Sequence, residues 1–349
     1  MTLGEGWRRD GGSGWRHSCR GRGTDAIGSD KGTERARHAT RPVAMSGAAV
    51  LRPPVFTGPC TVPVAGVLFR DTPAAPHQRQ RQEAIARELE YLRQHMPEGA
   101  LVVSLDRRNI TSGLALSRVL LQMQQRSSYN GRRYVYKVLL PWTLGRMGIC
   151  RALVADEDLL IRVASLRGLL ALPDALPLGA ARPVLWLAAE QSSAGTRRYG
   201  FNASFNGGIQ LWDLEAMRGE QGGQYAEAVQ LVANGTRRFG ATGDQAFYTT
   251  LNAARPGLIG TVPCAWNWQV GSTDQDRGIG LRTREVDALC RSQCNILHMN
   301  WPAFKPLVRE FRRQDAAAAC TRAGALFANY TRSRHAWPLR KVHQCLCRA

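Results

Sequence analysis

A short apolar run that stops at three acidic residues, in the stretch Arg151–Leu160, dictates much of the fold expected for this chain. A continuous apolar run of this length is typical of a buried parallel strand, and ligands of α/β sheets gather at the carboxyl ends of such strands. Residues two apart on a strand point the same way, so Asp156 and Asp158 can meet one divalent cation while Glu157 turns to the opposite face. An ordinary acidic turn is the alternative, and these residues alone favour it.

The composition limits the size of the core that the chain can bury and the classes of partner that it can bind. The 349 residues can bury one large core or two modest ones, and an apolar share of 44% is enough for a globular domain. A formal net charge of +20 would ordinarily indicate nucleic acid or an anionic membrane surface as a partner. The excess is mostly scattered arginine, without a dense basic block or a recognisable nucleic-acid-binding module. We therefore expect no nucleic-acid partner, and we interpret the charge partly as an arginine bias and partly as suited to anionic ligands such as a nucleotide diphosphate.

The cysteines and the apolar runs indicate the cellular compartment in which the protein is expected. No apolar run approaches the roughly 20 residues of a membrane span, and the N-terminus shows no apolar signal-peptide core. Disulfides in an oxidising lumen explain the C-terminal cysteines better than zinc does, although Cys290 and Cys294 have the spacing of half a zinc site. These cysteines are Cys264, Cys290, Cys294, Cys320, Cys345 and Cys347. Sequons, which agree weakly with a secretory route, begin at Asn109, Asn202, Asn234 and Asn329.

The middle of the chain alternates strand-like and helix-like segments. Val62–Phe69, Ala100–Leu105 and Val184–Ala189 have the apolar runs of strands. Gln78–His95 has the amphipathic pattern of a helix between the first two. Leu159–Leu172 is predicted to be helical or irregular. Because strands alternate with helices, the sequence predicts an α/β fold with a mainly parallel central sheet.

Lys137 lies within Tyr134–Leu140, an apolar segment that looks like a helix with its exit at Pro141–Leu144. A snorkelling lysine on a surface helix is the commoner fate of such a residue. The functional alternative is a phosphate contact close to the acidic strand.

Polar residues follow other strands and turns in the same way. Glu190 and Gln191 end their strand as the acidic residues end the first, which predicts a shared site. Asn206 and the glycines after it offer hydrogen-bonding groups and a backbone that a ligand can approach closely, although a plain tight turn is the simpler interpretation. Asp244 and Gln245 stand just ahead of a helix, where an acidic residue would ordinarily be a helix cap.

The order of these features resembles one family, the metal-dependent retaining sugar-nucleotide transferases of the glycogenin and LARGE kind, which have a GT-A fold. The likeness is closest to the xylosyltransferase-type domain of LARGE and runs from about residue 62 to residue 347. The segments that carry it are Tyr136–Pro141, Asp156–Asp158, Glu190–Gln191, Phe205–Gly208, Asp244–Gln245, Val262–Asn267 and His298–Lys305. Each segment alone is a weak signal, whereas their order and spacing together are specific.

The resemblance implies a metal site and phosphate contacts. Asp156, Asp158 and His298 would bind Mn²⁺, which suits carboxylate oxygens with one imidazole and offsets the charge on a departing UDP. Lys137 and Lys305 would add positive charge near the phosphates. A lone histidine is more often a hydrogen-bonded core residue than a ligand, but the acidic pair upstream and Lys305 downstream outweigh that interpretation of His298.

The resemblance also implies a sugar site. Asn206, Gly207, Glu190 and Gln191 would shape the donor-sugar pocket. As the catalytic pair, Asp244 and Gln245 would hydrogen-bond the sugar hydroxyls or orient the acceptor. No protein nucleophile is assigned.

The expected activity is transfer of a sugar, xylose by resemblance, from a UDP-sugar to a glycan or glycoprotein acceptor in the Golgi lumen or secretory pathway. Residues 61–349 would form this glycosyltransferase domain, and residues 1–60 a disordered basic tail or a non-native extension. Met1–Cys60 shows no apolar strand of the kind that holds the nucleotide in relatives. In relatives this strand precedes the segment that here begins at Val62, so we expect either that it is missing from this sequence or that a different segment fills its place. A catalytically impaired binding or scaffold protein is the alternative function.

Overall fold

The computed structural model describes one compact unit within Ala48–Ala349. The described residues are 59–70, 78–106, 110, 119, 122, 134–177, 179–191, 204–234, 243–270, 290, 293–299, 305–314, 316–329 and 336–347. The predicted tail therefore lies outside the described residues except for its last two positions, 59 and 60.

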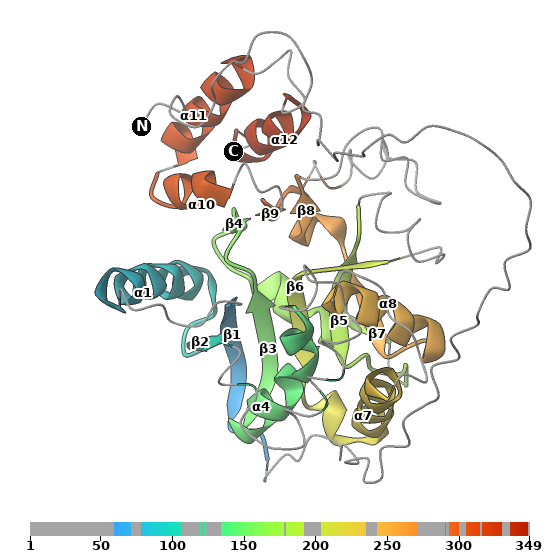
Figure 1. Cartoon of the computed structure of the whole chain (residues 1–349). Coiled ribbons are helices and arrows are strands. Elements are labelled where there is room, and N and C mark those ends of the chain that lie inside the picture. The colour runs from blue at the N-terminus through green and yellow to red at the C-terminus, as the bar shows by residue number, and fades with distance from the viewer. Residues whose placement is uncertain are drawn as a thin grey trace, which may run out of the picture. The chain divides into compact units, whose positions relative to one another are not determined.

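A six-stranded sheet forms the centre of this unit (Figure 1). Its strands, in spatial order, are β2 (Leu101–Asp106), β1 (Val62–Arg70), β3 (Ile149–Ala155), β6 (Phe205–Asp213), β5 (Leu185–Ala189) and β7 (Ile259–Val262). Only β6, among these described strands, runs antiparallel to its neighbours. The predicted α/β fold with a mainly parallel sheet is confirmed.

β1 lies directly beside β3, the strand that precedes the acidic residues. It pairs with β3 in parallel from Val62 to Leu68 and with β2 on its other side. The place next to the acidic strand is therefore filled. The strand expected ahead of Val62 would fall in residues 1–58, which lie outside the described residues, so both alternatives for it stay predictions.

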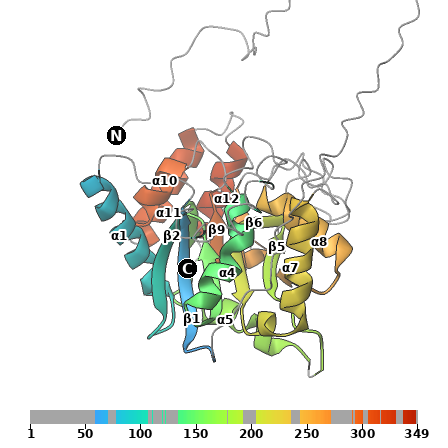
Figure 2. The ribbon, with the colours of Figure 1, turned by 60° about the horizontal axis from the view of Figure 1, so that its bottom comes forward.

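Alternate residues of β3 face two different cores. Ala152 and Val154 belong to a core on one face of the sheet, with residues of α4 (Leu140–Arg146), α7 (Glu220–Ala233) and α8 (Asp244–Ala254). Leu153 and Ala155 belong to a core on the other face, with residues of α1 (Gln78–His95) and α5 (Arg167–Leu170). A strand buried on both faces needs a continuous apolar run, which explains the pattern in the sequence. Figures 1 and 2 show α7 and α8 side by side, away from α1.

The segment that contains Lys137 is helical, as predicted. It forms a 3₁₀ helix, η1 (Val135–Leu139), that continues into α4. The exit expected at Pro141–Leu144 is wrong, because these residues form the first turns of α4. Proline suits the first turn of a helix, since its missing N–H would have no partner there.

A second sheet of three strands carries His298. It joins β4 (Leu159–Ile161), β9 (Ile296–His298) and β8 (Trp268–Gln269) in that order. The prediction that Leu159–Leu172 is helical or irregular is therefore wrong at its start, where β4 pairs antiparallel with β9. A short buried apolar run cannot be assigned by periodicity alone, since a strand and a helix segment look the same at this length.

The rest of Leu159–Leu172 fits the prediction better, with α5 followed by the 3₁₀ helix η2 (Leu172–Ala175). Two further 3₁₀ helices are η3 (Ala216–Arg218) and η4 (Cys264–Trp266). A third core forms between the small sheet and the C-terminal helices, which lie together in Figure 1. These helices are α10 (Lys305–Phe311), α11 (Ala316–Asn329) and α12 (Ala336–Leu346).

One of the described disulfides, Cys294–Cys345, ties the segment before β9 to α12. The six C-terminal cysteines pair as Cys264–Cys290, Cys294–Cys345 and Cys320–Cys347. The prediction of disulfides is confirmed, and the zinc interpretation of Cys290 and Cys294 is wrong because each bonds a different partner. A fourth disulfide, Cys60–Cys150, joins the starts of β1 and β3 and was not predicted.

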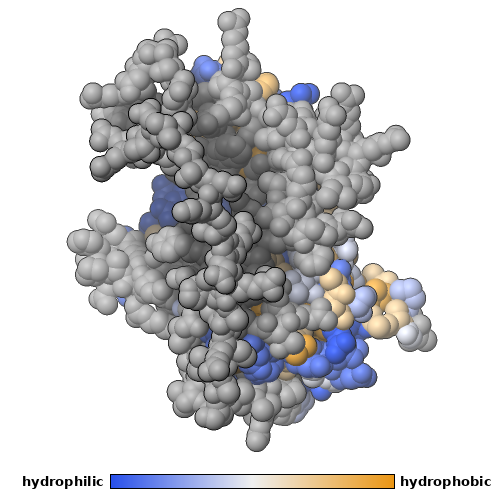
Figure 3. Space-filling view, turned by 45° about the vertical axis from the view of Figure 1, so that its right-hand side comes forward, coloured by the Kyte–Doolittle hydropathy of each residue, from blue (hydrophilic) through white to orange (hydrophobic). Residues whose placement is uncertain are grey.

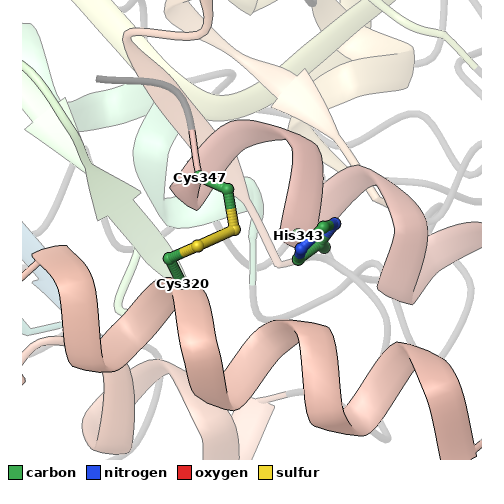
Figure 4. A group of neighbouring side chains, drawn as sticks. All are labelled: Cys320, His343 and Cys347. Carbon is green, nitrogen blue, oxygen red and sulfur yellow. A yellow bond between two sulfur atoms is a disulfide. The ribbon is translucent and has the colours of Figure 1, made fainter.

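One group near the C-terminus has the composition of a metal site. Cys320, His343 and Cys347 lie within 4.8 Å of one another. Figure 4 shows that the two sulfur atoms are joined and that the imidazole stands beside them. Disulfide sulfur is not a thiolate, so the group lacks the ligands that a zinc ion requires. Instead, the His343 ring stacks on Phe327.

Figure 3 shows one face of the molecule, on which the coloured residues include both hydrophilic and hydrophobic ones. None of the described helices combines the length and apolar character needed to cross a membrane.

Candidate functional site

Polar residues meet where β3 and β5 end and β6 begins. The Asp156 N–H donates to the Gly208 carbonyl over 2.9 Å, and the Glu190 N–H donates to the Ser204 carbonyl over 2.8 Å. Because β6 runs opposite to β3 and β5, its first residues lie at the carboxyl ends of both strands. The sequence-predicted residues Asp156, Glu190 and Asn206 therefore share one edge of the sheet.

Asp156, Asp158 and His298 converge at this edge. One potential ligand atom from each lies within 4.8 Å of those from the other two. The Asp158 Oδ1 is 3.3 Å from the His298 Nε2. The small sheet causes this approach, because Leu159 pairs with His298 and the Met299 N–H donates to the Asp158 carbonyl over 2.8 Å. Residues far apart in the sequence thus form a group that could hold a metal ion.

The route by which the two aspartates meet differs from the expected one. β3 ends at Ala155, so Asp156 and Asp158 lie in the turn between β3 and β4 and not on one face of a strand. The turn still separates the acids as predicted, since Glu157 is exposed and Asp158 is buried. An acidic turn and a metal-binding group are therefore not alternatives here, because the turn places the two carboxylates together.

The donor set fits a divalent cation. Two carboxylates and one imidazole suit Mn²⁺ and related ions, which favour oxygen and accept nitrogen. His298 is only 4% exposed, and its Nδ1 has no hydrogen-bond partner among the described residues. Because buried polar nitrogens are usually paired, this unpaired nitrogen fits a ring that binds a ligand such as a metal ion. Gly208 leaves room for this ring, since a Cβ at that position would overlap the imidazole.

Lys137 is buried in the middle of the site and is not a snorkelling surface residue. Its Nζ lies 2.6 Å from the Asp156 Oδ1 and 3.7 Å from the Asp244 Oδ2. It also donates to the Gly207 carbonyl over 2.8 Å. Burial lowers the pKa of Lys137, but the charges of Asp156 and Asp244 outweigh burial and raise the pKa above its ordinary value. The ammonium therefore stays charged and holds two acids and the start of β6 together.

Asp244 lies at the first position of α8 and faces inward. Its Oδ2 accepts a hydrogen bond from the Gln210 Nε2 over 3.1 Å. Burial raises the pKa of Asp244 to about 6, Lys137 opposes the rise, and the charge of Asp156 adds to it. Gly207 has no side chain to block this carboxylate, since a Cβ there would overlap the Asp244 Oδ2. More than a helix cap, Asp244 belongs to the same charged cluster as Lys137.

Gln210 is a site residue that the sequence did not reveal. Its Nε2 donates to Asp244, and its Oε1 accepts from the Trp212 Nε1 over 3.1 Å and from the Tyr248 hydroxyl over 3.3 Å. The side chain is fully buried. The sequence signal that could have revealed Gln210 is an amide side chain within a strand that is buried on both faces.

Asn206 links β6 to the end of β5. Its Nδ2 donates to the Glu190 Oε2 over 3.0 Å, and its Oδ1 accepts from the Gly208 N–H over 3.0 Å. The adjacent Gln191 is bonded to β8: its Oε1 accepts from the Gln269 N–H over 2.9 Å, and the Gln269 Oε1 accepts from the Gln191 N–H over 3.2 Å. The strand end that carries Glu190 is thus tied to both sheets.

Two further residues, Gln245 and Lys305, were predicted to belong to the site. Gln245 is half-buried beside Asp244, and its carbonyl accepts from the Thr249 hydroxyl over 2.8 Å. Lys305 begins α10, but its side chain lies outside the described residues. Its role near the phosphates stays a prediction.

Comparisons with known proteins give similarity in structure alone. No protein-family model matches the chain, and no curated protein matches it in sequence. Mouse xyloside xylosyltransferase 1, in its apo form, is 23% identical over 72% of this chain and 89% of that chain, with a TM-score of 0.49. An active-site mutant of LgtC is 14% identical over 68% of this chain and 88% of that chain, with a TM-score of 0.37.

The galactosyltransferase LgtC, in complex with donor and acceptor sugar analogues, is 14% identical over 80% of this chain and 95% of that chain, with a TM-score of 0.33. At such identities and scores, the assignment of residue roles rests on the chain's own side chains.

Proposed function

We propose that this protein is a metal-dependent, retaining glycosyltransferase of the GT-A kind that moves a sugar from a UDP-sugar to a glycan or glycoprotein acceptor. The observation that carries the proposal is the convergence of Asp156, Asp158 and His298 at the carboxyl edge of the sheet. Ligand sites of α/β sheets lie at this edge. Xylose is the first candidate for the sugar, by resemblance.

Asp156, Asp158 and His298 would hold Mn²⁺. Such an ion, when bound, supplies positive charge that offsets the diphosphate of the departing UDP. The ion pair with Lys137 holds the Asp156 carboxylate in one position before any ligand arrives. This paired state supports a positioning role for Lys137 besides the predicted phosphate contact. Lys305 is proposed to contact the phosphates as well.

The sugar is proposed to lie over the start of β6. Asn206, Gly207, Glu190 and Gln191 would form the pocket for the donor sugar, and the hydrogen bond from the Asn206 Nδ2 to the Glu190 Oε2 would hold two of these side chains in place. The catalytic pair, Asp244 and Gln245, would bind sugar hydroxyls or orient the acceptor. The acceptor hydroxyl would attack on the face from which UDP leaves, so the anomeric configuration is retained, and no protein nucleophile is assigned.

The four disulfides support an oxidising compartment. We place the protein in the Golgi lumen or the secretory pathway on this basis. Cysteine pairs of this number are rare in the reducing cytosol, where thiols are kept reduced.

The test uses the full chain, a panel of UDP-sugars and Mn²⁺, with UDP release as the readout. Asp156→Ala and Asp158→Ala should lose UDP release and should also lose Mn²⁺ binding measured by electron paramagnetic resonance. Glu157→Ala is the matched control, because this acid lies in the same turn but is exposed. Equal turnover by the wild type and both aspartate variants would disprove the proposal.

The alternative, a catalytically impaired binding or scaffold protein, was motivated by the missing first strand ahead of Val62. Residues 1–58 lie outside the described residues, so this motive is untested, whereas the convergence of Asp156, Asp158 and His298 supports the transferase. UDP binding without any turnover across the panel would favour the alternative instead.

A further inference from the structure

Asn267 is a buried residue to which the proposed mechanism assigns no role. It lies between η4 and β8 and is fully buried. Its N–H donates to the Cys264 carbonyl over 3.0 Å, and its carbonyl accepts from the Gln191 Nε2 over 2.9 Å. Its side-chain Nδ2 donates to the Asn206 Oδ1 over 3.0 Å. The backbone and the amide nitrogen are thus bonded within the protein.

The orientation of the Asn267 amide follows from its neighbours. Asn206 can be placed in only one way, because the Glu190 carboxylate accepts from its Nδ2 and the Gly208 N–H donates to its Oδ1. Asn267 must therefore present its nitrogen to the Asn206 Oδ1. A flip of the Asn267 amide would set two oxygens against each other.

This fixed orientation leaves the Asn267 Oδ1 without a partner. The atom is buried, and no hydrogen-bond donor reaches it in the part of the chain that the structure describes. Buried amide oxygens are nearly always paired, and an unpaired one costs folding free energy. An unpaired buried acceptor whose orientation is fixed points to a donor that arrives with a ligand.

Asn267 stands beside the proposed sugar pocket and the metal-binding group. Its partner Asn206 is followed by Gly207 and Gly208, which make way for Asp244 and His298. Two residues beyond Asn267, Gln269 pairs with His298 across β8 and β9. The unpaired oxygen therefore belongs to the polar network at the carboxyl edge and not to a distant part of the core.

We propose that the Asn267 Oδ1 accepts a hydrogen bond from one hydroxyl of the bound donor sugar and so selects sugars that carry this hydroxyl. The inference rests on the proposed function and deepens it. A sugar hydroxyl is a suitable donor, since it is neutral and can donate one hydrogen bond to an amide oxygen. A sugar without this hydroxyl leaves the oxygen unpaired and is rejected.

The experiment measures binding to the full chain by calorimetry in the presence of Mn²⁺. The ligands are UDP, UDP-xylose or whichever UDP-sugar of the panel binds most tightly, and the singly deoxygenated forms of that sugar nucleotide. For the wild type, removal of one particular hydroxyl should weaken binding about tenfold or more. Asn267→Ala should bind UDP as the wild type does, bind the intact sugar nucleotide about tenfold more weakly, and no longer distinguish that deoxygenated form.

Gln224→Ala is the control, because this amide bonds Glu220 on α7 and has no contact with the network. It should match the wild type with every ligand. If no deoxygenated form binds more weakly to the wild type, the proposal is overturned, and a bound water satisfies the oxygen instead. This arm needs no variant, so a folding defect in Asn267→Ala does not obscure it. Failure of UDP itself to bind would instead count against the proposed function, and the inference would fall with it.

Discussion

Lys137 and Asp156 form a buried ion pair, with the Nζ 2.6 Å from the Oδ1 and the lysine side chain 1% exposed. The same ammonium lies 3.7 Å from the Asp244 Oδ2 and donates to the Gly207 carbonyl. One cation thus joins η1, the turn after β3, the start of β6 and the start of α8. Without it, two buried carboxylates would face each other.

Replacement of Lys137 by methionine keeps the volume of the side chain and removes its charge. We expect Lys137→Met to lower the free energy of unfolding by about 3–5 kcal/mol, the usual cost of removing one partner of a buried pair. Urea unfolding measures the loss. Arg93→Met is the control, because Arg93 pairs with Glu90 at the surface with more than half of each side chain exposed. Its loss should stay below about 1 kcal/mol. If both variants lose similarly little free energy of unfolding, Lys137 does not stabilise the neighbouring carboxylates.

Gly208 makes room for the His298 imidazole, so a methyl group there should disturb the metal-binding group. In Gly208→Ala the new Cβ would overlap the ring. We expect Mn²⁺ affinity to fall about tenfold or more, the usual effect of disturbing a ligand's setting. Gly223→Ala is the matched control, since its Cβ would meet nothing within 4 Å on α7. There the change should slightly stabilise the helix and leave Mn²⁺ binding as it is. Equal Mn²⁺ affinity in both variants would contradict the placement of His298.

Asp244 should make stability depend on pH. Its pKa is about 6 in the folded protein, because burial raises it, against about 3.9 in an unfolded chain. Between these values the folded state holds a proton that the unfolded state has lost, so the stability contributed by this group falls as the pH rises from about 4 through about 6. The full effect is at most about 3 kcal/mol.

The measurement compares wild type with Asp244→Asn by urea unfolding at several pH values. Asparagine does not titrate, and its amide oxygen can still accept from Gln210. The stability of the wild type relative to Asp244→Asn should decline from about pH 4 to about pH 6 and then level off. A constant difference over this range would show that Asp244 has an ordinary pKa.

The sequence predicted the features that depend on local pattern. The apolar run of β3 and its acidic end were visible, because a strand buried on both faces must be apolar throughout. β4 was missed, since a three-residue strand has no period of its own and forms only by pairing with β9. The turn position of Asp156 was missed because an apolar run that stops at acidic residues does not show whether the first acid ends the strand or begins the turn.

Partners distant in the sequence set the rest of the site. Lys137 looks like a surface lysine until η1 is placed under β6, where the Gly207 carbonyl and two carboxylates surround it. The roles of Gln210 and Asn267 depend equally on tertiary contacts. The existence of disulfides followed from cysteine number and spacing, but their pairing did not, since sequence spacing allows many connectivities.

The Cys294–Cys345 disulfide should support the metal-binding group as well as the fold. It ties the segment four residues before His298 to α12. By loop-closure entropy, Cys294→Ala combined with Cys345→Ala should cost about 4 kcal/mol of stability. Cys320→Ala combined with Cys347→Ala is the control, because it opens a loop of similar kind between α11 and α12. Its cost should be about 3.5 kcal/mol.

The two pairs should therefore differ little in urea unfolding but differ in Mn²⁺ binding. Loss of Cys294–Cys345 removes the link between α12 and the residues just before β9. His298 should then be held less firmly opposite Leu159, and Mn²⁺ affinity should fall. Loss of Cys320–Cys347 leaves the Cys294–Cys345 link between the segment before β9 and α12 in place, and Mn²⁺ affinity should stay near that of the wild type. Calorimetry under conditions where both variants are folded makes the comparison. Equal Mn²⁺ affinities would show that pairing with β4 alone positions His298.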